Sequence, residues 1–309
     1  MVDIDLFITA LFFLVDNFCI QNPVPPKPGP DPSLNASEAI TLLIFSQWAR
    51  FRSEQDFYRF ADKKLRSAFP DLPSYPQLNR QWRALHDQTC AFFTHLAESL
   101  DAQKAFYEAM DTGPIVTRNA KRRGSGWLVG QADIGHSNRL GWYEGLKVLL
   151  AVTPKGIITG FGLSPASAKE QPMAETFLYL RDNPDPHIVS VGQTGYGQYY
   201  PVDKGFRGYE NQKRWKEAYR AYVICPPKSS SRNPWPKPLR RWVASIRQIV
   251  ETAFDKILYT FRLDRERPHL LDGVRTRLAA KVALHNFCIW LNRQLGRADL
   301  EFADLLGWE

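Results

Sequence analysis

The sequence predicts a mixed α/β domain preceded by an all-helical region of about 100 residues. In the first hundred residues, apolar side chains recur at helical spacing between proline-rich breaks. From about residue 104 the pattern changes to strand-like runs and a hairpin, followed by alternating helices and strands. We therefore expect a helical region over residues 1–100 and an α/β domain over residues 101–309.

Composition is that of a globular protein with a basic surface. The 309 residues are 44% hydrophobic and 13% aromatic, which excludes a disordered chain. The net charge of +8 and the pI near 9.3 are compatible with a polyanionic partner but do not establish one. The four cysteines lie far apart with no CxxC pair, so neither a zinc ribbon nor a disulfide framework is indicated, and a reducing compartment is expected.

The apolar run near the N-terminus predicts a buried helix. It extends from Leu6 to Val15, is flanked by Asp5 and Asp16, and has no Lys or Arg before it. Ten residues are too few to span a bilayer, and a signal peptide would begin with basic residues. We therefore expect a cytoplasmic protein without a membrane segment.

The rest of the first hundred residues is predicted to be helical. Residues 21–32 are so rich in proline that we expect an extended connector. Asn35 followed by Glu38 resembles a capping box at the start of the next helix. Further helices are expected over 53–69 and, after a proline-marked break, over 77–100.

The second part of the chain is predicted to alternate between strands and helices. A strand is expected over 105–117, and a hairpin over 141–165 with its turn at residues 153–156. The later expected elements are strands over 198–206 and 220–227, and helices over 167–182, 210–219, the segment around 246–254, and 273–296. This order describes a mixed sheet flanked by helices.

Three acidic residues occupy positions at which a metal site could form. Asp111 ends an apolar run before "TGP", Asp203 ends another before "KGFRG", and Glu251 lies on a later helix. The ends of adjacent strands can bring two aspartates together, and like charges that close need a cation. Oxygen ligands suit Mg²⁺ or Mn²⁺, and two such ions roughly 3.5–4 Å apart would support phosphoryl transfer on DNA or RNA. Asp133, in a polar loop, and Glu144, on a strand, rank below Asp111 as the first acid.

Simpler interpretations of these acids remain open at this point. Asp111 and Asp203 each stand close to a glycine, where an aspartate is most often a turn residue. Arg247 and Glu251 are four residues apart on a predicted helix, and such pairs are usually solvated surface ion pairs.

Four blocks of the chain resemble DDE transposases of bacterial insertion sequences. They are "DTGPI", "GWYEGLKVLLAVTPKGIITGFGLSPASAKEQPMAE", "VDKGFRG" and "RQIVETAFDKI" with the segment up to residue 286. The resemblance implies a ribonuclease-H-like core in which Asp111, Asp203 and Glu251 bind two Mg²⁺ or Mn²⁺ ions. It also implies an endonuclease that cuts element ends and joins their 3′ hydroxyls to target DNA, acting as a homodimer on paired ends in the bacterial nucleoid.

Two rival functions fit the same resemblance. A two-metal nuclease or resolvase would cut DNA without joining it. A transposase-derived protein that has lost activity would bind DNA only.

Basic and aromatic residues provide candidate DNA contacts. Basic loops can follow phosphates, and a tryptophan can stack on an unpaired base, although a solvated charge run with aromatics in the core is an open alternative. A proline-marked turn before residues 75–86 suggests a recognition helix. The candidate contacts are Lys204, Arg247, Arg122, Arg123, Arg240, Arg241, Trp235, Arg80 and Arg83.

Overall fold

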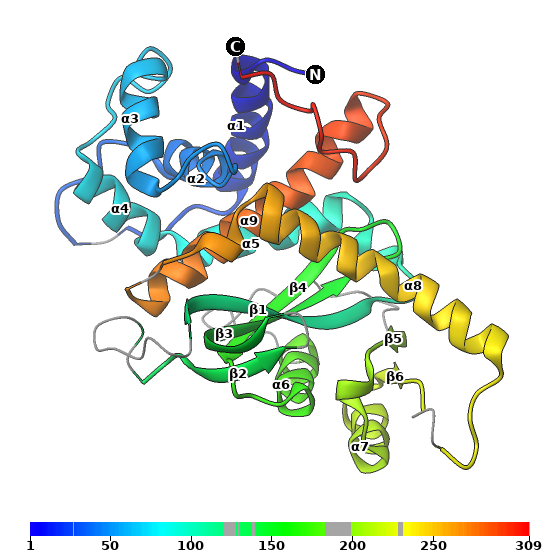
Figure 1. Ribbon diagram of the computed structural model, residues 1–309. Helices are drawn as coiled ribbons and strands as arrows, with labels where there is room; N and C mark the ends of the chain where they lie inside the picture. Colours follow the sequence, from blue (N-terminus) through cyan, green and yellow to red (C-terminus); the bar gives the residue numbers. More distant parts are fainter. Residues whose placement is uncertain are drawn as a thin grey trace.

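The computed structural model describes residues 1–26, 28–119, 128, 130–137, 140–182, 199–227, 231–267 and 269–308. A helical region stands above a sheet whose two faces are both covered by helices (Figure 1). The fold is mixed α/β with a helical N-terminal region, as the sequence predicts, and is consistent with a ribonuclease-H-like domain.

The helical region contains α1 (Ile4–Gln21), α2 (Ala36–Phe45), α3 (Glu54–Lys64), α4 (Tyr75–Ala84) and α5 (His86–Ser99). The predicted capping box is present. The side chain of Asn35 accepts from the Glu38 amide, and Glu38 accepts from the Asn35 amide, both at 2.8 Å.

The single helix expected over 77–100 is in fact two helices that meet at Leu85. Leu85 leaves the helical region of the backbone, with φ −99° and ψ 13°. The two helices have different packing partners: the indole of Trp82 on α4 donates to the carbonyl of Ala39 on α2 at 2.9 Å, whereas α5 packs along the C-terminal helix. Tertiary packing therefore overrides the continuous helical pattern of this segment.

Helix α1 is longer than the ten-residue apolar run. With 18 residues, α1 is the one described helix that has the length and hydropathy expected of a membrane span. The argument that this segment is too short to cross a bilayer therefore does not hold. One face nevertheless packs into the core, where the ring of Phe7 contacts those of Phe45, Trp48 and Phe287. A soluble protein's core helix passes the same test, and the buried face is what the sequence predicts for this segment.

The sheet is built around a long central strand. The antiparallel strands are β1 (Ala109–Asn119), β2 (Asp133–Ser137), β3 (Gly141–Val152) and β4 (Ile158–Pro165). Strand β3 pairs with β1 along one edge and with β4 and β2 along the other. The expected hairpin turn is present, and Gly156 adopts the left-handed φ of +82° that it requires. Asp133 opens β2 rather than lying in a loop, because its backbone pairs opposite Gly145.

Two short strands extend the sheet beyond β1. Strands β5 (Tyr199–Pro201) and β6 (Tyr222–Ile224) run parallel to each other. Parallel bridges Tyr107–Tyr199 and Met110–Val202 attach β5 to the start of β1. The short helix η2 (Lys204–Phe206) follows β5, and α7 (Tyr209–Tyr219) connects it to β6. The chain direction is therefore the same in β1, β5 and β6.

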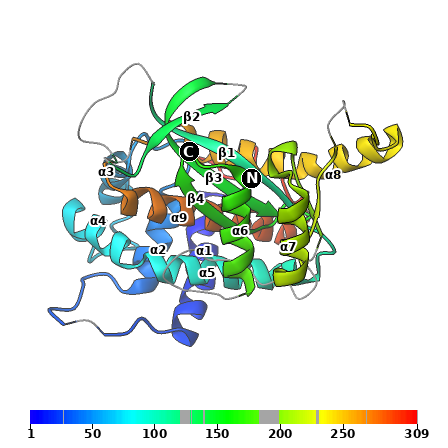
Figure 2. The same cartoon turned by 90° about the horizontal axis from the view of Figure 1, so that it is seen from below.

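Helices cover both faces of the sheet (Figures 1 and 2). One face is covered by α5, α8 (Lys237–Asp255) and α9 (Leu271–Gln294), with the short helices η1 (Ala102–Lys104), η3 (Lys256–Thr260) and η4 (Leu263–Arg265) between elements. On the other face, α6 (Glu170–Asp182) packs Phe177 into a core with Met110 and Leu149.

Helix α9 is held to the β3–β4 hairpin by buried polar bonds. The side chain of Asn286 accepts from the amide of Ile158 at 3.0 Å and donates to its carbonyl at 2.9 Å. The preceding residue, His285, forms a hydrogen bond through Nε2 with the carbonyl of Gly156 at 2.8 Å. The core under α9 is continuous with that of the helical region.

Candidate active site

Asp111 and Asp203 stand side by side on neighbouring parallel strands. Met110 on β1 is bridged to Val202 after β5, and each aspartate is the next residue along its chain. Because the two strands run in the same direction, the aspartates occupy equivalent positions on neighbouring strands. The negative charge of Asp203 accordingly helps to raise the pKa of Asp111. The structure thus brings together two of the three predicted acids.

Asp111 lies in a largely buried, charged environment. Its Oδ1 accepts from the amide of Thr112 at 2.8 Å, and its Oδ2 lies 3.0 Å from Nη2 of Arg247. Burial raises the pKa of Asp111 to about 6, against the opposing charge of Arg247. A buried carboxyl beside a second carboxylate is one that a further cation would stabilise in its ionised form.

Asp203 is more exposed and is bordered by groups that the sequence did not indicate. Its side chain caps η2 by accepting from the amide of Lys204. The thiol of Cys225 donates to its backbone carbonyl at 3.1 Å, and burial raises the pKa of that thiol. The carboxylate of Glu170 lies against Gly205. Cys225 follows β6, and Glu170 begins α6. Local sequence patterns therefore gave no signal that these two residues border Asp203.

Glu251 is exposed on α8. It lies between two residues of this helix that contact β1. One turn before it, Arg247 reaches Asp111, and three residues after it, the ring of Phe254 packs over Gly113. Arg247 therefore pairs with the first aspartate and not with Glu251, so the intrahelical pair suggested by spacing is replaced by a helix-to-sheet pair. Among the described residues, no three acidic, histidine or cysteine side chains gather as a metal site, so Glu251 is not joined to the two aspartates.

The competing acids lie far from Asp203. Asp111 pairs opposite Leu150 on β3, whereas Glu144 is six residues earlier on that strand, roughly 20 Å away. Asp133 pairs at the same distant end, opposite Gly145. Neither can share a site with Asp203.

The donor set of the paired aspartates fits a hard divalent cation. Two carboxylates on neighbouring strands provide the oxygen ligands that Mg²⁺ or Mn²⁺ prefers. Arg247 partly neutralises this pair in the structure, and its Nε has no acceptor within the described part of the chain. The site therefore combines two metal-type ligands with a guanidinium suited to a phosphate oxygen.

The candidate DNA contacts fall into separate places. Arg240 and Arg241 are exposed on the first half of α8, which extends beyond the sheet (Figure 1). Trp235 precedes this helix and is half-buried, and Lys204 is exposed beside Asp203. Arg122 and Arg123 lie outside the described residues.

On the expected recognition helix, α4, the polar residues turn in different directions. Arg80 is exposed, whereas Arg83 donates to Glu54 at 2.7 Å and Asn79 donates to the same carboxylate at 2.9 Å. Arg83 is thus engaged inside the protein, which leaves Arg80 as the outward-facing basic residue of the pair.

Comparison with known families assigns the catalytic region. The model of the transposase DDE domain matches residues 109–287, from the start of β1 into α9, and includes Asp111, Asp203 and Glu251. Neither the curated proteins nor the solved structures contain a significant match. The match covers more than half of the 309 residues and spans the strands and helices that bring the aspartates together. On this evidence, the chain belongs to the family of transposases with a DDE domain.

Proposed function

We propose that this transposase cuts the ends of an insertion sequence and joins the freed 3′ hydroxyls to target DNA. Membership of the family establishes a transposase-type polynucleotidyl transferase. The observation that supports the finer proposal is the placement of Asp111 and Asp203 at equivalent positions on parallel strands. Carboxylates so arranged are suited to in-line displacement at a phosphodiester.

The residues that would hold the cations are Asp111, Asp203 and Glu251. Two Mg²⁺ or Mn²⁺ ions held there would supply charge neutralisation at the attacking and leaving oxygens. Glu251 lies on the same side of α8 as Arg247, four residues away, and we propose that it closes the cluster on the DNA-bound protein.

Arg247 would exchange partners when the substrate is bound. In the structure its guanidinium neutralises Asp111, and a cation at the aspartates would free its fork of donors for a phosphate oxygen. Lys204, exposed directly after Asp203, would contact the DNA strand that carries this phosphate. Among the described residues, the contacts of the two aspartates include no serine or tyrosine side chain, so transfer would proceed without a covalent protein intermediate.

The basic surface would carry the rest of the DNA. Arg240 and Arg241 would contact the DNA backbone, Trp235 would stack on an unpaired base, and Arg122 and Arg123 would add positive charge. The division at residue 100 separates a region for DNA binding and assembly from the catalytic domain. Two copies would act together on paired ends in the bacterial cytoplasm, at the nucleoid.

Cleavage and joining of short duplexes carrying the element's ends test this function. The assay would compare the wild type with Asp203→Asn and Glu251→Gln in Mg²⁺. The matched control is Asp255→Asn, because Asp255 is exposed on α8 one turn beyond Glu251. We expect joined product from the wild type and the control, and a loss of at least about a hundredfold in both site variants.

Each other outcome has a distinct meaning. Cutting without joining would support the nuclease or resolvase, and binding without cutting would support the inactive DNA-binding protein. Full activity of Glu251→Gln would remove Glu251 from the site while leaving the paired aspartates in place.

A further inference from the structure

A second basic site lies where the helical region meets the C-terminal helices. It is a cavity of about 740 Å³ lined by the loop between α2 and α3, the start of α3, α4, η4 and the start of α9. Helices α3 and α4 and the start of α9 lie at the left in Figures 1 and 2. The lining includes neither of the paired aspartates nor Arg247, so the cavity is separate from the acidic site.

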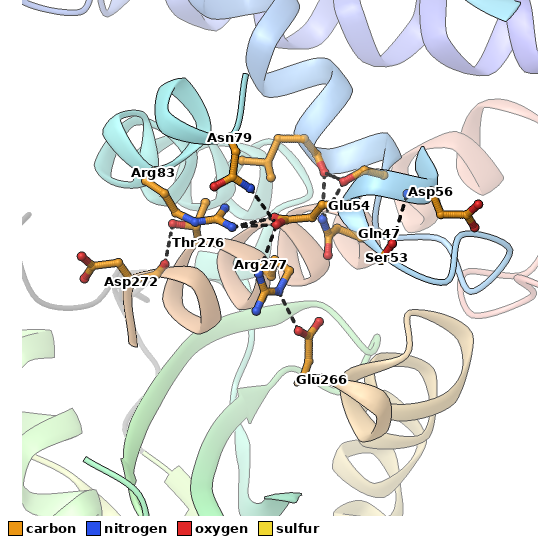
Figure 3. A network of polar contacts seen from close by, with 12 residues as sticks. Gln47, Ser53, Glu54, Asp56, Asn79, Arg83, Glu266, Asp272, Thr276 and Arg277 are labelled. Atoms are coloured by element: carbon orange, nitrogen blue, oxygen red, sulfur yellow. Dashed lines mark hydrogen bonds and ion pairs between the residues drawn. The ribbon is translucent and has the colours of Figure 1, made fainter. Parts of the chain in front are cut away.

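The inner wall of the cavity holds a network of buried charges (Figure 3). Glu54 lies 2.7 Å from Arg83 and 3.4 Å from Arg277. Glu266 lies 2.6 Å from Arg277 and 3.1 Å from Lys281. Three cations thus share two carboxylates, and one positive charge remains uncompensated in surroundings where charge is expensive to bury.

Other donors in the cavity wall lack acceptors within the described residues. Arg262 bonds only the backbone carbonyls of Phe51 and Arg52, pairs with no described carboxylate, and has a buried Nε without an acceptor. Nη1 of Arg83 and the indole nitrogen of Trp48 are likewise buried without one. Unsatisfied buried donors are costly, so they favour a ligand that brings acceptor oxygens.

The mouth of the cavity extends the positive charge to the surface. Arg52, Arg80, Arg265 and Arg267 line it and are exposed. In all, eight Lys and Arg side chains face three carboxylates in the lining, an excess of five positive charges. A buried site for a small anion alone would not need exposed arginines around its entrance, whereas a chain of phosphates would use them.

We infer that this cavity binds a phosphate group of the DNA backbone at a distance from the acidic site. The guanidinium groups supply the planar pairs of donors that phosphate oxygens accept. The inference rests on the proposed action on DNA, but it concerns binding and not strand cleavage. The bound phosphate joins the helical region to the catalytic domain, because both α4 and η4 contribute donors to the lining.

DNA binding without chemistry tests this site. The full-length chain carrying Asp111→Asn, with no divalent metal, would be titrated with labelled duplex at several salt concentrations. The added changes are Arg80→Gln with Arg267→Gln at the mouth, Arg80→Lys with Arg267→Lys as charge-retaining versions, and Arg59→Gln as a control on the exposed side of α3 outside the cavity.

The double glutamine variant is expected to lower the salt slope of log K by about 2 and the affinity by at least about tenfold. The lysine version and the control should keep the slope. An unchanged slope in the glutamine variant would overturn the inference, whether or not the wild type cleaves DNA. If the wild type did not cleave DNA but the glutamine variant still showed the lowered salt slope, that result would count against the proposed function alone.

Thermal unfolding with inorganic phosphate separates the two sources of the anion. We expect DNA to compete with phosphate, so that phosphate raises the midpoint of the wild type and weakens DNA binding in parallel. A different outcome is that phosphate stabilises the protein while the salt slope of DNA binding is the same with and without Arg80 and Arg267. That outcome would assign the cavity to a free anion and overturn the DNA assignment.

Discussion

The guanidinium of Arg247 on α8 lies 3.0 Å from the carboxylate of Asp111 on β1. This pair connects the helix that carries the third predicted acid to the strand that carries the first. It also places a cation where the paired aspartates need one. Arg247 and a divalent ion therefore compete for the same carboxylate.

Removing Arg247 should increase the affinity of the aspartates for Mg²⁺. In Arg247→Gln the opposing charge is lost, so the pKa of Asp111 should rise above about 6, and the comparison is made at pH 8 to keep Asp111 ionised. We expect Mg²⁺ to raise the thermal midpoint of this variant more than that of the wild type. Arg247→Lys, which keeps the charge, is the control, and equal Mg²⁺ shifts in all three proteins would contradict the competition.

The pH dependence of Mg²⁺ binding should follow Asp111. Because its pKa is raised to about 6, the proton competes with the cation below that pH. Stabilisation by Mg²⁺ should be present above pH 6 and lost as the pH falls through it, and not near 4 as for an ordinary aspartate. Thermal unfolding with and without Mg²⁺ between pH 3.5 and 8 measures this. A midpoint near 4 would place the cation away from Asp111.

Gly113→Ala should disturb the packing of α8 on the sheet. An added Cβ would lie 2.7 Å from the ring of Phe254, so this ring must move, alone or with the helix, at a cost of about 1–3 kcal/mol in the free energy of unfolding. Gly162→Ala on β4 is the control, because its Cβ would meet nothing within 4 Å. Denaturant unfolding measures both. Adding Phe254→Leu should recover part of the loss, and additive costs would exclude this contact as the cause.

The buried pair of Glu108 and Arg181 should be essential for stability. Glu108 is fully buried, and Arg181 also contacts the hydroxyls of Tyr200 and Thr159, which joins α6 to β4, to β5 and to the residue directly before β1. Glu108→Leu leaves the guanidinium without its carboxylate and should cost about 3–5 kcal/mol. The double variant with Arg181→Met should be much less destabilised. Urea unfolding of the two single variants and the double variant checks this, and additive losses would show that the two residues act independently.

His285 should make the protein sensitive to mild acid. Burial lowers its pKa to about 4, below the ordinary 6.5, and within the described part of the chain its buried Nδ1 has no acceptor for a second proton. A depressed histidine pKa contributes stability that is fully present above pH 6.5 and is lost as the pH falls towards 4. The free energy of unfolding should fall by about 2 kcal/mol from this group between pH 6.5 and 5. His285→Gln should lack this part of the pH dependence, whereas His136→Gln, at an exposed site on β2, should retain it.

Local pattern alone was enough to predict much of the architecture. The helical first hundred residues, the hairpin turn at 153–156, the capping box at Asn35 and the order of later strands and helices all depend on periodicity and turn chemistry within a few residues. That Asp203 follows a strand could be predicted in the same way, whereas Asp111 lies inside β1 and not at the end of the expected strand. Strand β2 and the break at Leu85 were missed, because a neighbouring element decides them.

Contacts between distant segments could come only from the tertiary structure. Periodicity tells which side of a helix is buried but not what covers it, so the helix around Arg247 could not reveal that its partner is Asp111, 136 residues earlier. The same holds for the bridge that places Asp203 beside Asp111, and for the cavity whose walls come from residues near 54 and 266. Burial and charge balance act across space, and a linear pattern records only one side of each contact.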